Sequence, residues 1–227
     1  MSKRIATALT ALLFVSGVAF TLGYVSHSSP STSTAAVTTT TSDLAQPATA
    51  MWPFANTPLR FSDPVTAASS FAVSYLGFSS PIVSKFMQGD GRSGEVTVRS
   101  VANGPLTTIL VRQLDRTDTW WVLGAATATI QITTPALLDT LSSPATLRGS
   151  STAFEAQVNV ELRADQSLTP IGMGTAMGGS MGEMGPFHSE VTFSPAPTKY
   201  GVIVMRTYSA RDGQVLEAAA LRIKYAN

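Results

Sequence analysis

The residues best suited to specific chemistry lie in a glycine-rich stretch, GMGTAMGGSMGEMG, over residues 172–185. Thioether sulfur is a soft ligand that favours Cu(I), and methionines three or four residues apart can gather around one ion. Ordering glycine is entropically unfavourable, so we expect a flexible connection between two strands. A copper site and an adaptable contact surface are the alternatives. The methionines concerned are Met173, Met177, Met181 and Met184.

Catalytic side chains are sparse. The chain has no cysteine and two histidines, His27 in a polar N-terminal tract and His188. A serine nucleophile needs an adjacent base, and a G-x-S-x-G motif is absent. The carboxylate pairs Glu161/Asp165 and Asp115/Asp118 have the spacing of surface and turn residues. We therefore expect no enzymatic activity, cofactor or bound metal; a wall-modifying enzyme, with two carboxylates facing each other across a cleft, is the alternative.

The overall charge argues against a nucleic-acid partner. The formal net charge is +1, and 13% of the residues are charged, against roughly 25% in a typical domain. No run or stripe of Lys and Arg occurs in the body of the chain. Binding to nucleic acid requires such a basic patch, so we expect none.

Residues 1–25 have the pattern of a membrane anchor. Lys3 and Arg4 precede an uncharged apolar stretch from Ile5 to Val25. A bilayer span needs about 20 apolar residues, whereas the core of a cleaved signal peptide has about 7–15. Because the positive flank stays in the cytoplasm, this pattern predicts a single-pass protein of the cell membrane with its C-terminal domains outside the cytoplasm. A cleaved signal peptide and secretion are the alternative.

The next segment, residues 26–58, is rich in Ser, Thr, Ala and Pro for most of its length. Such a composition lacks the large apolar side chains that offset the entropy of ordering. We expect a disordered tether.

Residues 59–128 predict a small α+β unit. Asp63 and Pro64 are typical of a helix start, and Gly77 is typical of a helix end. Apolar residues between them have helical spacing. Three alternating segments follow, which predict antiparallel strands with one face covered by the helix, namely 94–101, 106–114 and 119–126.

Trp120 and Trp121 are adjacent, so a strand would point them to opposite faces. We expect one of them in the core. The other is either exposed, marking an interaction surface, or covered by the helix and the neighbouring domain.

From residue 129 to 227 the sequence consists of short strands and turns. Around seven strands in this length predict a β-sandwich. Phe154, Val158 and Leu162 alternate with polar residues, which predicts one core-facing row in which Phe154→Ala loses about 3–5 kcal/mol. On the opposite face, Glu155 would pair with an arginine of a neighbouring strand, Arg206 or Arg222.

The C-terminal segment carries, in order, Pro135, Ser143-Pro144, Gly149, Phe154-Glu155, Phe187 and Ser209-Ala210-x-Asp212-Gly213. With these residues it resembles the immunoglobulin-like domain family of bacterial spore germination, over about residues 130–227. The resemblance implies an immunoglobulin-like sandwich in an exported or membrane-tethered protein that mediates interactions rather than catalysis.

Together these patterns predict a mainly β protein. An N-terminal hydrophobic helix would precede a small α+β unit of one helix and three antiparallel strands, followed by the C-terminal immunoglobulin-like β-sandwich. The expected function is that of a membrane-anchored, non-catalytic binding or scaffolding module of the cell envelope. Its partner would be another envelope protein or the cell-wall polymer.

Overall fold

The structure, a computed structural model, describes residues 46–114 and 116–226. The predicted anchor over residues 1–25 lies outside them, and in the part that is described no helix is long and apolar enough to cross a membrane. Residues 42–227 form one compact unit. Every described helix and strand and both hydrophobic clusters lie in this unit, so it carries what its own folding requires.

The helix α1 (Pro64–Phe71) begins and ends as its sequence predicts. The Asp63 carboxylate caps it by accepting a hydrogen bond of 2.7 Å from the Thr66 backbone N–H. The helix continues into a π-helical turn, η1 (Ala72–Leu76), and Gly77 ends it with a φ of 87°.

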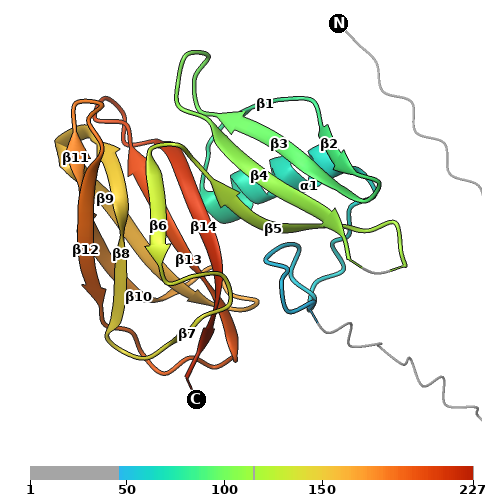
Figure 1. Cartoon of the computed structure of the whole chain (residues 1–227). Coiled ribbons are helices and arrows are strands. Elements are labelled where there is room, and N and C mark those ends of the chain that lie inside the picture. Colours follow the sequence, from blue (N-terminus) through green and yellow to red (C-terminus); the bar gives the residue numbers. More distant parts are fainter. Residues whose placement is uncertain (1–45, 115, 227) are drawn as a thin grey trace, which may run out of the picture. The chain divides into compact units, whose positions relative to one another are not determined.

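The larger sheet has ten strands, and its main path runs β1-β3-β4-β5-β14-β13-β9-β10 (Figure 1). The short strands β2 and β7 pair with β3 and β14. The single register pair Ala125–Ala220 joins β5 to β14, so the sheet crosses from the first half of the chain to the second. Its strands are β1 (Ile82–Val83), β2 (Met87–Asp90), β3 (Ser93–Arg99), β4 (Thr107–Gln113), β5 (Trp120–Ala126), β7 (Thr140–Leu141), β9 (Gln157–Ala164), β10 (Pro170–Met177), β13 (Tyr200–Tyr208) and β14 (Val215–Tyr225).

A second, four-stranded sheet packs on the C-terminal part of the first and completes a sandwich. It consists of β6 (Ile130–Thr134), β8 (Ala145–Ala153), β11 (Gly179–Ser180) and β12 (Gly185–Val191). All strand pairings are antiparallel except two short ones, β11 with β8 and β7 with β14. A mainly β chain with antiparallel sheets is thus confirmed.

Strands β13 and β14 are buried on both faces. Ile203 and Met205 point into the sandwich core, whereas Val202 and Val204 belong to a second cluster together with α1 residues such as Phe71. Figure 1 shows what covers each face. The second sheet lies on one side of β13 and β14, and α1 covers the larger sheet on the other side. The two hydrophobic clusters therefore share the same two strands.

The predicted tether is wrong at its C-terminal end. Residues 46–58 are packed against the larger sheet, and Met51, Trp52 and Phe54 are buried in the cluster beneath α1. The Trp52 backbone forms a β-bridge with Val122 of β5. These apolar side chains supply the burial that the preceding polar tract lacks; residues 26–45 lie outside the described part of the chain.

The predicted core position of Phe154 is also wrong. Val158, Val160 and Leu162 are buried in the sandwich as expected, but the Phe154 side chain is 64% exposed. Between β8 and β9 the chain makes a 3-10 turn (Phe154–Ala156) in which Glu155 and Ala156 have φ values of 55° and 61°. This turn interrupts the strand alternation, so Phe154 does not continue the buried row of β9.

Candidate binding site

The residues considered for catalysis do not come together. His188 lies on the exposed face of β12, opposite Arg148 of β8. Glu161 and Asp165 are each bound to arginines, and Asp115 and His27 lie outside the described residues. Among the residues that the structure describes, no three His, Cys, Asp or Glu side chains are grouped closely enough to hold a metal ion.

The prediction of a flexible loop over residues 172–185 is wrong for its first part, because residues 172–177 belong to strand β10. Met173 and Met177 lie on the same face of this strand, about 13 Å apart at their Cα atoms. Glycine is required here for close approach. A Cβ at Gly174 would lie 2.9 Å from a Val191 methyl carbon, and one at Gly179 would lie 1.9 Å from the Glu183 carbonyl oxygen.

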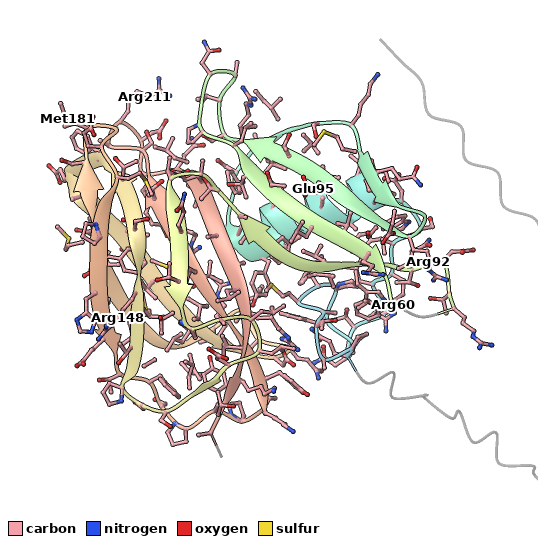
Figure 2. The ribbon with its side chains drawn as sticks, viewed as in Figure 1. Arg60, Arg92, Glu95, Arg148, Met181 and Arg211 are labelled. Carbon is pink, nitrogen blue, oxygen red and sulfur yellow. The ribbon has the colours of Figure 1, made fainter. Side chains whose placement is uncertain are left out.

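The end of β10 forms an exposed apolar surface together with the turn that precedes β9. Backbone contacts connect the two: the Gly178 N–H donates to the Ala156 carbonyl oxygen at 3.1 Å, and Ser180 pairs with Ala153. Figure 2 labels Met181 at this end of the sandwich; its side chain is 91% exposed. We call this surface the tip and define it by its exposed residues, Phe154, Met177, Met181 and Met184.

The backbone at the tip is strained. Glu155, Ala156 and Met181 all have positive φ between 55° and 61°, a region that side-chain-bearing residues seldom occupy. Such strain persists only where surrounding structure holds it, and it concentrates at functional positions.

The two tryptophans differ in their exposure. Trp121 is 3% exposed, and the Arg60 guanidinium lies 5.6 Å from its ring centroid. Trp120 is half-buried and makes an edge-on contact with Phe86, with the two ring centroids 5.2 Å apart. One of the two indoles is therefore buried, as expected, and the other stays partly exposed.

Below α1, the helix-facing side of the sandwich carries a buried charged network. Arg163 donates from Nε to the Glu161 carboxylate at 2.8 Å and from Nη1 to the Tyr75 carbonyl oxygen at 2.8 Å. Arg206 donates to the other Glu161 oxygen and, at 3.3 Å, to the Leu76 carbonyl oxygen. The last carbonyls of a helix lack partners within it, so these two arginines satisfy the end of η1.

Arg222 forms the second part of the network. Its guanidinium is fully buried and binds both Asp165 oxygens, one of them at 2.7 Å, and it donates from Nε to the Ala48 carbonyl oxygen at 2.8 Å. The predicted role of Glu155 is therefore wrong: the partners of Arg206 and Arg222 are Glu161 and Asp165, because Glu155 lies in the 3-10 turn away from the sheet face.

Burial also shifts proton affinities in this region. Desolvation lowers the pKa of Arg163 and Arg206, and it raises the pKa of Tyr75 to about 12 against the opposing effect of nearby Arg163. The same cause raises the pKa of Tyr225, whose hydroxyl donates to the Arg163 carbonyl oxygen at 3.1 Å. Arg163 and Arg206 fasten the end of η1 to the sandwich sheet, whereas Tyr225 belongs to the sandwich core.

An apolar groove lies on the side of the larger sheet opposite α1, where β4 and β5 meet β14 and the β6–β7 turn. Its volume is about 510 Å³. The Glu95 side chain, labelled in Figure 2, marks this uncovered face of the sheet on β3. The apolar walls of the groove come from Leu110, Leu114, Leu123, Leu137 and Leu221.

The sequence carries a signal for this groove that the strand patterns alone did not connect to a site. Strand alternation places Ile109 and Val111 in the core and Leu110 with Arg112 on the outer face, so Leu110 is an outward-facing leucine. Leu137 stands outside any strand in the β6–β7 turn. Large apolar residues at polar positions indicate a surface that another molecule covers.

The fold of the described residues is that of an antiparallel β-sandwich joined to a helix-covered sheet. Residues 129–214 match the model of a protein family described as the immunoglobulin-like domain of bacterial spore germination. The C-terminal part of the chain thus belongs to this family, as its motifs suggest. The final strand, β14, lies beyond the matched residues but completes the same sheet. No curated protein and no solved structure matches the chain at a significant level.

Proposed function

We propose that the chain is a membrane-anchored, extracytoplasmic protein of the cell envelope that acts as a non-catalytic binding or scaffolding module. Residues 1–25 would anchor it, with Lys3 and Arg4 in the cytoplasm, and the segment before Gln46 would hold the folded unit away from the membrane. The anchor-like N-terminal pattern and the immunoglobulin-like family match support this proposal.

The α+β unit over residues 59–128 and the sandwich over 129–227 would act as one rigid body. Their shared hydrophobic cluster and the arginine network under η1 support this arrangement. A binding surface on either part would then keep a defined direction relative to the other.

The tip is the observation that carries the proposal. Exposed apolar clusters mark contact sites, and methionine adapts its shape to a partner. The backbone that presents these side chains is held in a strained conformation, which supports a selected role. The partner we favour is an envelope protein with an apolar pocket, rather than the wall polymer, because Trp121 is buried and the Trp120 indole is only partly exposed.

Photo-crosslinking in envelope extracts would test this proposal with residues 42–227. The test variant carries Phe154→Ser, Met181→Ser and Met184→Ser, and the control carries Met87→Ser, another exposed methionine located on β2. We expect the unmodified protein and the control to crosslink to one envelope protein, and the tip variant to lose that product. Equal crosslinking by all three proteins, or none by any of them, would contradict the tip as the binding surface.

A further inference from the structure

The apolar groove beside β4 and β5 is a second site, separate from the tip. Its volume of about 510 Å³ lies within the roughly 300–1,000 Å³ of small-molecule sites. Leu110 and Leu137, on its two sides, are 40% and 57% exposed. Leaving these side chains in water is unfavourable by about 25 cal/mol for each Å² of apolar surface, so an apolar ligand would be stabilised here.

Two arginines line the groove, and one of them, Arg112, is accessible to a charged ligand. Arg222 lines it, but its guanidinium is already bound to Asp165 and Ala48. Arg112 also lines it, and its half-exposed side chain has Asp90 as a distant partner at 3.7 Å. An exposed ion pair of this length contributes little, so the Arg112 guanidinium is available to an anion.

The topology argues against a peptide as the ligand. The groove is lined by β4, β5 and β14, which are interior strands of the ten-stranded sheet. Beyond the single register pair of β5 with β14, residues 51–52 bond the backbone of β5 and residues 138–139 bond the backbone of β14. A peptide laid in the groove would bury backbone N–H and C=O groups without partners, which is unfavourable. A hydrocarbon chain carries no such groups.

We propose that this groove binds a single-chain amphiphile with an anionic head group. The hydrocarbon chain lies against Leu110, Leu123 and Leu137, and the head group, a carboxylate or a phosphate monoester, meets Arg112. Apolar walls with one charged group that sets the orientation are typical of small-molecule sites. This site does not depend on the tip, so either proposal can fail while the other holds.

Binding can be measured by NMR titration of residues 42–227 with three probes of equal chain length, each below the concentration at which it aggregates. These are dodecanoate, dodecyl phosphate and the cationic dodecyltrimethylammonium. We expect saturable shifts at the amides of Leu110, Leu123 and Leu137 with at least one anion, and binding of the cation about tenfold weaker or less. The tighter of the two anions distinguishes a fatty-acid ligand from a phosphate-headed lipid.

Two arginine variants separate head-group recognition from general charge. Arg112→Gln should weaken binding of the anion about tenfold and leave the cation unchanged, because it removes one charge-assisted hydrogen bond. Arg148→Gln, at an exposed arginine on β8 of the sandwich (Figure 2), should change neither. Leu110→Asp, at a partly exposed position, should keep the far-ultraviolet spectrum and abolish binding.

Three results would overturn the proposal. The first is the absence of saturable binding of either anion, and the second is equal affinity for the anion and the cation. The third is an equal loss of affinity with Arg112→Gln and Arg148→Gln.

Discussion

Strands β13 and β14 present two buried faces that are held by different chemistry. On the sandwich side, Ile203 and Met205 pack against Leu162 and other aliphatic residues. On the α1 side, the same strands carry Arg206 and Arg222 among Val and Ala residues, and both arginines bind carboxylates. The sandwich face is held by apolar packing. The α1 face is held by apolar packing together with ion pairs and hydrogen bonds to the carbonyl groups at the helix end.

This difference teaches how each contact selects its geometry. An aliphatic face tolerates small shifts, because any close packing of the right volume buries similar area. A planar guanidinium that meets a carboxylate and a backbone carbonyl together tolerates far fewer. We infer that the arginines set the position of α1 and residues 46–58 on the sheet, whereas the sandwich core supplies burial.

The largest expected effect comes from breaking the charged face. Arg222→Met should lower the free energy of unfolding by about 3–5 kcal/mol, because it leaves the Asp165 carboxylate without its cation. Urea denaturation measures this loss. The double variant Asp165→Asn/Arg222→Met should recover part of it, and a double variant no more stable than Arg222→Met would contradict a charge-based cause.

The apolar face should respond through cavity formation. Leu162→Ala is expected to lower the free energy of unfolding by about 2–5 kcal/mol, because Leu162 is fully buried between the two sheets. Leu168→Ala is the matched control, since that leucine is exposed in the loop before β10. Similar losses for the two variants, measured by urea denaturation, would be inconsistent with the sandwich core described.

Alkaline pH should weaken the α1 face through Tyr75. Its ordinary pKa of about 10 rises to about 12 in the folded protein, so the folded state keeps a proton that the unfolded state releases. Stability is therefore complete below pH 10 and falls as the pH rises toward 12, by about 1.4 kcal/mol at pH 11. Tyr75→Phe should remove this part of the decline, as measured by denaturation at pH 8 and pH 11.

The comparison for this experiment is the difference between the two pH values, because the phenylalanine variant has its own stability at pH 8. Tyr225 contributes a decline of the same sign in both proteins, since its pKa is also raised. An identical pH dependence in wild type and Tyr75→Phe would show that Tyr75 does not stay protonated in the folded state.

The smallest effect is expected at the tip, which belongs to neither face. Phe154→Ala should change the free energy of unfolding by less than about 0.5 kcal/mol, because the side chain is 64% exposed. The strand alternation alone predicts about 3–5 kcal/mol for the same change. A loss of about 3–5 kcal/mol would show that Phe154 is buried in the core, and this would contradict the exposed surface described at the tip.

Much of the fold could be predicted from local patterns. The period-two alternation of Val158, Val160 and Leu162 fixes the buried side of β9, and Asp63 and Gly77 mark the ends of the helix. The predicted burial of Phe154 was wrong because Glu155 and Ala156 adopt positive φ, and nothing in the sequence indicates this conformation for residues other than glycine. The packing of residues 46–58 was missed because their apolar residues follow a long polar tract.

The sequence by itself determined most of the strands, β10 excepted, and which side of each is apolar, because backbone geometry imposes those periods locally. It also identified the family of the C-terminal segment. Only the tertiary structure decided that Arg206 pairs with Glu161 and Arg222 with Asp165, and that Leu110 and Leu137 meet across one groove. These pairings join segments far apart in the chain, and no local period specifies which distant segment covers a given face.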